Sequence, residues 1–152
     1  MATSTATKPA AKRAPAKKTT AAVATTPPLI GEYWRGQGGI YIGVAAADGD
    51  LPQGHLILCE ATSSKRFVWA DAVAWAKKQT ADGHTDMRLP TRFEAALIYA
   101  NGRKHVDVGP WYWTGTEYDA SYAWNCFFDG GTQDYNHKGL TGAARAVRRV
   151  TF

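Results

Sequence analysis

The first apolar runs of the chain have the composition of β-strands. Gly39 to Val44 joins Ile, Tyr and Val, and His55 to Cys59 carries Leu-Ile-Leu. Between these runs, Ala47-Asp-Gly-Asp50 is a sequence that favours a turn. The pattern therefore predicts a β-hairpin, with a loop longer than the two-residue type.

Apolar residues at helical spacing follow in the middle of the chain. They predict a helix with one apolar face, formed by Trp69, Ala72, Val73 and Ala76. A second helix is expected after Pro90, because Thr91 can cap the backbone N–H of Glu94 and Glu94 can complete a capping box. Asn101-Gly102 ends this helix. Its predicted buried face consists of Phe93, Ala96, Leu97 and Ala100.

After Pro110 the pattern returns to short strand-like runs. These runs are Trp111 to Thr114, Ala123 to Phe128 and Ala144 to Val150, with a strong turn signal at Asp129-Gly-Gly-Thr132. Helices in the middle and strands at both ends predict an α+β domain in which the N- and C-terminal strands pair.

Residues 1–28 differ from the rest of the chain, since they are almost wholly Ala, Thr, Lys and Pro. Too few apolar groups are present to offset the entropy of ordering, so we expect a disordered tail at 1–28 and one folded domain at 29–152. All basic residues of the tail precede the first acid, Glu32, and the remaining 13 basic residues balance the 13 acids, so the tail carries the net charge of +5. Weak contact with nucleic acid is one role for such a tail, and we favour a flexible tether.

The two cysteines and the apolar runs indicate where the protein is made. Cys59 and Cys126 are too few for a disulfide framework, and we favour two buried free thiols over a pair. No apolar run reaches membrane-spanning length, and the first residues lack the apolar region of a signal peptide. We expect the protein in the cytoplasm or in a virion.

No arrangement of residues matches a catalytic or metal site. His55, His84, His105 and His137 are scattered along the chain. Two His-x-Asp pairs, which begin at His84 and His105, lack a further set of ligands. We therefore expect neither an enzyme nor a bound cofactor or metal.

The segment from Glu117 to His137 is rich in tyrosine and amide side chains, which are typical of adaptable binding surfaces. Core packing is the alternative role for its tyrosines. The candidate ligand-binding residues are Tyr118, Tyr122, Asn125, Gln133, Tyr135, Asn136 and His137.

The larger rings and the closing arginines are expected to specify the fold. Arg145 and Arg148 are expected to pair with Glu117 or Asp119 and so fix the last strand. The rings that we assign to the core are Trp111, Trp113, Trp124, Phe127 and Phe128.

Four motifs, in order along the chain, resemble those of a family of C-type-lectin-like domains, the domain of unknown function 1566. They are Arg88-Leu-Pro-Thr91 with Glu94, Trp113-Thr-Gly-Thr-Glu-Tyr118, Ala123-Trp124 with Phe127, Phe128 and Asp129-Gly130, and Arg145 with Val147-Arg148-Arg149. The resemblance covers about residues 30 to 152. It implies a lectin-like fold, with two helices on small antiparallel sheets and both termini brought together.

The resemblance also bears on function. Similar domains include the C-terminal domain of a bacterial collagen-like adhesin and lectin-like proteins of phages and prophages. The receptor-binding, hypervariable proteins diversified by phage retroelements share the broad fold. Calcium-dependent lectins carry a Glu-Pro-Asn or Gln-Pro-Asp tripeptide and a Trp-Asn-Asp strand, whereas this chain has Trp124-Asn125-Cys126. Because a thiol is a poor ligand for calcium, we do not expect calcium-dependent sugar binding.

These observations predict a non-catalytic recognition module of phage or prophage origin that binds a cell-surface glycan or protein. The alternative is a structural role, as a virion accessory or capsid-decorating protein that is anchored by its tail and contacts other subunits. Related folds often form trimers, so the resemblance also allows a homo-oligomer.

Overall fold

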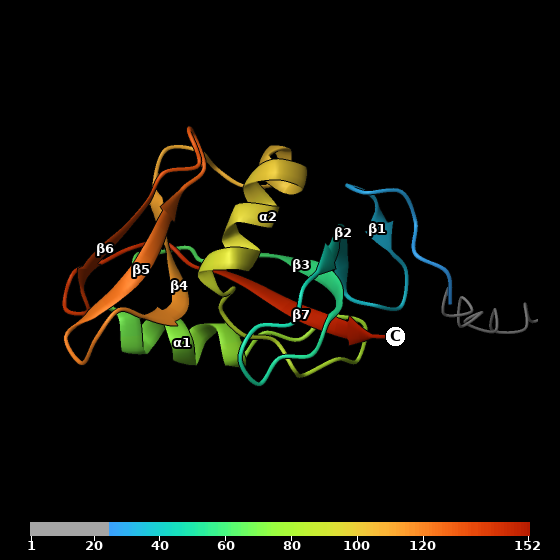
Figure 1. Cartoon of the computed structure of the whole chain (residues 1–152), viewed down its shortest axis with the longest axis horizontal. Helices are drawn as coiled ribbons and strands as arrows, with labels where there is room; N and C mark the ends of the chain where they lie inside the picture. Colours follow the sequence, from blue (N-terminus) through green and yellow to red (C-terminus); the bar gives the residue numbers. More distant parts are fainter. Residues whose placement is uncertain (1–24) are drawn as a thin grey trace, which may run out of the picture.

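The computed structural model describes residues 25–152. Within this range, two α-helices, a short 3₁₀ helix and seven strands form an α+β fold with two antiparallel sheets, as the pattern predicts. The predicted disordered tail lies outside the described residues up to residue 24. The described chain begins beside β1 and ends close by, at the same end of the molecule (Figure 1).

The larger sheet has the order β1-β2-β3-β7. It contains β1 (Tyr33–Trp34), β2 (Gly39–Ala45), β3 (Gly54–Thr62) and β7 (Arg145–Thr151). The predicted hairpin is confirmed, because β2 and β3 pair in antiparallel fashion. The C-terminal strand joins the N-terminal strands through β3, where Thr151 lies opposite Gly54.

The smaller sheet has the order β4-β5-β6. Its strands are β4 (Trp111–Glu117), β5 (Tyr122–Phe127) and β6 (Gln133–His137). No strand is predicted for Gln133–His137, whose residues other than Tyr135 are polar. It becomes a strand because the turn after β5 brings it into register, with Gln133 opposite Cys126 and His137 opposite Tyr122.

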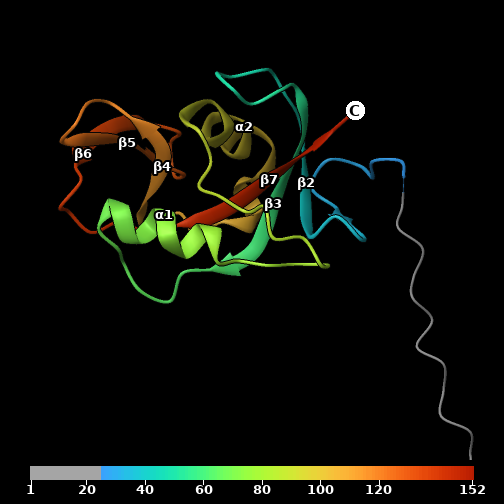
Figure 2. The same ribbon diagram turned by 90° about the horizontal axis from the view of Figure 1, so that it is seen from below.

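The two helices pack on different sides of β7 (Figure 2). Helix α1 (Trp69–Lys77) buries Ala72 and Ala76, in agreement with the predicted apolar face. Helix α2 (Arg92–Gly102) begins with the predicted capping box, in which Thr91 and Glu94 bond each other's backbone N–H. A 3₁₀ turn, Arg103–His105, follows it.

The predicted buried face of α2 is wrong. The helix buries Glu94, Ala95, Ile98 and Gly102, while Phe93 is 64% exposed. The reason is the environment of Glu94, whose carboxylate accepts hydrogen bonds from Arg88 and Arg149 at 2.7–2.8 Å. An acidic residue with two arginine partners is stable in the interior, so α2 turns this side inward.

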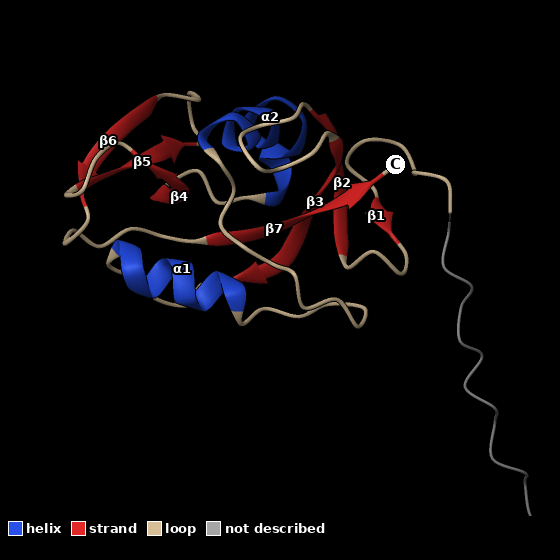
Figure 3. Cartoon of the chain, turned by 60° about the horizontal axis from the view of Figure 1, so that its bottom comes forward, coloured by secondary structure: helices blue, strands red, loops and turns tan. Residues whose placement is uncertain are grey.

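The two helices lie beside strands of both sheets (Figure 3), and buried side chains of these elements form the core. One cluster joins Ile42, Leu56 and Ile98 with Phe128 of the segment after β5, and a second joins Ala72 with Trp113. Trp113 and Phe128 are buried, as expected, whereas three rings of the predicted core are only half-buried. These are Trp111, Trp124 and Phe127.

The expected partners of the closing arginines are also wrong. Arg148 pairs with Asp86 at 2.8 Å, and Arg145 donates to the carbonyl oxygens of Cys59 and His105. Because β7 lies beside β3, its side chains do not meet the β4–β5 turn. There, Glu117 pairs instead with Lys138 at 2.7 Å.

Both cysteines are buried free thiols, as favoured from the sequence. Burial raises the pKa of Cys126 to about 11. Among the described residues, no helix is long and apolar enough to cross a membrane.

Candidate recognition surface

Aromatic side chains from β5 and β6 gather on one face of the smaller sheet. Successive residues of a strand point to opposite faces, so Tyr122 and Trp124 share a face of β5. The pairing places His137 opposite Tyr122 and Tyr135 opposite Trp124. The β4–β5 turn adds Tyr118, whose ring contacts both Trp124 and Tyr135. We call these five residues the aromatic surface.

The rings of the aromatic surface are interlocked. Tyr118 and Tyr135 stack with their centroids 4.0 Å apart and an interplanar angle of 6°. Tyr122 meets Tyr135 edge to face at 5.9 Å and His137 at 5.5 Å. Trp124 meets Tyr135 in the same manner at 5.6 Å. Each ring therefore restricts the rotamers of its neighbours.

Arg92 joins the aromatic surface to helix α2. Its guanidinium carbon lies 3.5 Å from the centroid of the Trp124 ring. Its Nε donates to Gln133 Oε1 at 3.2 Å, while the Gln133 amide donates back to the Arg92 carbonyl. Among residues 25–152, Arg92 is not part of any ion pair. Its charge is therefore not neutralised by any acidic residue in this part of the chain.

The tyrosines of the aromatic surface are accessible, with exposures of 50% for Tyr118, 37% for Tyr122 and 41% for Tyr135. The turn that carries Tyr118 is held by Asp119, whose Oδ1 accepts from the N–H groups of Ser121 and Tyr122 at 2.7 and 2.8 Å. The accessible rings thus stand on a hydrogen-bonded turn and two paired strands.

The structure brings together four of the seven candidate ligand-binding residues, Tyr118, Tyr122, Tyr135 and His137. A fifth, Gln133, lies at the edge of this group because it is bonded to Arg92. Asn136 lies on the opposite face of β6, since it alternates with Tyr135 and His137.

Asn125 does not belong to the aromatic surface. It points to the face opposite Trp124, is fully buried, and lies opposite Trp113 of β4. Neither the oxygen nor the nitrogen of its amide group has a hydrogen-bond partner among the described residues. A partner molecule therefore cannot reach this side chain in the folded protein.

Sequence reasoning missed two members of the site. The sequence pattern assigns Trp124 to the core, although its alternation with Tyr122 along β5 indicates that the two rings share a face. Arg92 gave no signal, because the contact with Trp124 depends on how α2 packs against the sheet.

The tyrosine hydroxyls of the surface and the histidines elsewhere in the fold have defined interactions. Interaction with Tyr118 raises the pKa of Tyr135 above its ordinary value, so this phenol is protonated at neutral pH. His84 and His105 contact the carbonyl oxygens of Gly36 and Gly31, which gives both a structural role. In the described part of the chain, no three His, Cys, Asp or Glu residues are placed to hold a metal ion.

No family model and no curated protein matches the chain. We therefore interpret the aromatic surface from its geometry.

Proposed function

We propose that this protein is a non-catalytic recognition module that binds a cell-surface glycan or protein through its aromatic surface. The observation that carries the proposal is the set of three accessible, interlocked tyrosines beside Arg92, which has no acidic partner within residues 25–152. Tyr, Trp and Arg dominate binding hot spots because they offer large contact areas and several hydrogen bonds at a low entropic cost.

The energetics of the free protein support this role. Exposed aromatic rings contribute little to the stability of the folded protein, because their apolar area stays in water. Contiguous exposed apolar surface is a common mark of an interaction site. The mutual packing of the rings and the bonded β4–β5 turn reduce the entropy that binding would cost.

The position of the surface also supports a tethered module. The β4-β5-β6 sheet lies at one end of the molecule, and the described chain begins at the other (Figures 1 and 2). An anchor at the N-terminal side would thus leave the aromatic surface free to meet a partner.

We further propose that the fold is C-type-lectin-like and that the protein is of phage or prophage origin. Two helices, two small antiparallel sheets and the neighbouring ends of the described range, residues 25–152, agree with the four sequence motifs that resemble domain of unknown function 1566. Sugar binding would not use calcium at Cys126, because that thiol is buried with a pKa of about 11.

The test is binding of the full chain to glycan arrays and to bacterial cells. We expect Tyr122→Ala and Tyr135→Ala each to weaken binding at least about tenfold, as hot-spot residues do. Tyr33→Ala is the matched control, since Tyr33 is 41% exposed and lies on β1. If no glycan or cell binds and the chain instead purifies with phage particles, a structural virion role replaces recognition.

A further inference from the structure

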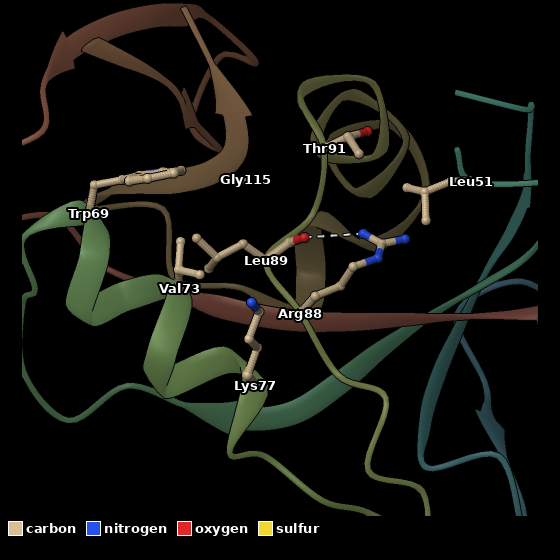
Figure 4. A pocket seen from close by; sticks show the side chains of 8 residues that line it. All are labelled: Leu51, Trp69, Val73, Lys77, Arg88, Leu89, Thr91 and Gly115. Carbon is tan, nitrogen blue, oxygen red and sulfur yellow. Dashed lines mark hydrogen bonds between the residues drawn. The ribbon is translucent and has the colours of Figure 1, made fainter. Parts of the chain in front are cut away.

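A cavity of about 300 Å³ lies between helix α1, the segment before α2 and strand β4. It shares no residue with the aromatic surface. Figure 4 shows its walls, in which Trp69 and Val73 of α1 face Leu89. Its lining consists of Leu51, Trp69, Val73, Lys77, Arg88, Leu89, Thr91 and Gly115.

The walls of the cavity are fixed rather than mobile. The indole N–H of Trp69 donates to the Thr114 carbonyl at 2.9 Å, which holds the ring as a flat wall. Leu89 is buried at its base, and Gly115 donates its N–H to the Pro90 carbonyl at 2.8 Å. An apolar group could therefore enter without displacing a side chain from the core.

The charges of the cavity are unbalanced. None of its lining residues is acidic. Arg88 donates to Glu94 through two hydrogen bonds of 2.7 and 2.8 Å. Glu94 also pairs with Arg149, so these three residues together keep one positive charge. Lys77 is exposed and forms no ion pair within residues 25–152. Its ammonium group points toward Leu89, at the apolar wall (Figure 4).

We infer that this cavity binds a small amphipathic carboxylate, whose apolar body lies between Trp69, Val73 and Leu89 and whose carboxylate meets Lys77. The volume is at the lower limit of small-molecule sites, which restricts the ligand to one ring or a short chain. A carboxylate is favoured over a neutral group because it supplies the negative charge that the Lys77 ammonium group does not meet within residues 25–152.

The lining also argues against larger or more polar ligands. A dianion such as a phosphate ester requires several donors, and here Arg88 is already occupied by Glu94. The hydroxyl of Thr91 is the remaining polar side chain, and it accepts from the Glu94 N–H as the helix cap. One charged contact and an apolar body therefore define the ligand class.

The experiment uses 4-phenylbutyrate as the probe and its neutral amide, 4-phenylbutanamide, as the matched ligand. Binding to the full ¹⁵N-labelled chain is followed by NMR titration. We expect saturable shifts at the Val73 and Gly115 amides and at the Trp69 indole N–H, with a dissociation constant on the order of 1 mM. The amide should bind about three- to fivefold more weakly, as expected for an exposed ion pair.

Substitutions separate the charge from the cavity. Lys77→Gln should weaken the binding of 4-phenylbutyrate by the same factor, so that the two probes bind equally well. Lys78→Gln, at the adjacent exposed lysine, should leave the affinity for both probes unchanged. Gly115→Leu should block both probes by filling the space, since a Cβ at Gly115 meets its nearest atom, Leu89 Cβ, at 3.5 Å. Val73→Phe is a second blocking variant.

Three results would overturn the inference. They are shifts that map outside the cavity, binding that Lys77→Gln leaves unchanged, and binding that survives both blocking variants in folded protein. Because the aromatic surface shares no residue with the cavity, none of these outcomes depends on the proposed recognition function.

Discussion

Arg92 and Trp124 form the contact that joins helix α2 to the aromatic surface, with the guanidinium carbon 3.5 Å from the ring centroid. Arg92 is the first residue of α2 and Trp124 lies in β5. The contact therefore connects the best-defined local feature of the chain, the capping box at Thr91, with the site that we propose for recognition.

We expect Arg92→Ala to lower the free energy of unfolding by about 1–2 kcal/mol, because a partly buried cation–π contact and the Gln133 hydrogen bond are lost. Arg92→Lys keeps the charge but not the planar stacking, and should recover less than half of this loss. Urea unfolding measures both values. Arg103→Ala is the control, because Arg103 is exposed and lies 5.6 Å from the Tyr99 ring. Equal losses at Arg92 and Arg103 would contradict the prediction.

Glu94 is the buried charge on which the packing of α2 depends. Glu94→Gln is expected to cost about 3–5 kcal/mol, because it breaks buried ion pairs with Arg88 and Arg149. Glu117→Gln removes an ion pair from a carboxylate that is 55% exposed and should cost less than about 1 kcal/mol. Thermal or urea unfolding of the two variants gives the comparison. A small loss at Glu94 would mean that the arginines find other partners.

The same carboxylate predicts a pH dependence of stability. Burial acts to raise the pKa of Glu94, but Arg88, the Thr91 N–H and Arg149 hold it below its ordinary value of 4.5. A depressed pKa in the folded state gives stability that is complete above pH 4.5 and is lost as the pH falls through the folded-state pKa. We therefore expect the free energy of unfolding of the unsubstituted protein to fall as the pH is lowered below 4.5. In Glu94→Gln, the free energy of unfolding should change less steeply with pH below pH 4.5. The slope should be smaller by up to about 1.4 kcal/mol per pH unit, which corresponds to one proton bound on unfolding.

The features of this fold that depend on residues close in sequence were easier to predict than those that depend on tertiary contacts. The capping box at Thr91 and the hairpin of β2 and β3 depend on residues close in sequence, and both are confirmed. The buried face of α2 was wrong because hydrophobic periodicity treats Glu94 as a surface residue, whereas two distant arginines stabilise it inside. Strand β6 was missed because its polar residues are ordered by pairing with β5.

The aromatic surface likewise has features that composition predicts and features that depend on strand pairing. Composition identified the tyrosines between Glu117 and His137, but only the β5–β6 register shows that Tyr122 and Tyr135 meet while Asn125 turns inward. Such register is fixed by long-range pairing, which residue types alone do not reveal.

The two thiols provide a direct test of the core. Cys59 is 2% exposed, and Cys126 is fully buried with a pKa of about 11. We expect neither thiol to react with a disulfide reagent in the native protein at pH 8, because the thiolate that would attack is absent or inaccessible. Both should react after unfolding in guanidinium chloride. Rapid reaction of one thiol before unfolding would show that its side of the core opens locally.

The stacked pair Tyr118 and Tyr135 predicts that the aromatic surface is organised before a partner arrives. In a double-mutant cycle of Tyr118→Ala and Tyr135→Ala, we expect a coupling free energy of about 0.5 kcal/mol, because both rings are exposed and aromatic pairs contribute about 0.5–1.5 kcal/mol beyond their buried area. Urea unfolding measures it. The control cycle combines Tyr135→Ala with Tyr33→Ala, which lies in the other sheet and should be additive. If the two cycles agree, the rings do not support each other, and the surface must order its side chains on binding at a cost in affinity.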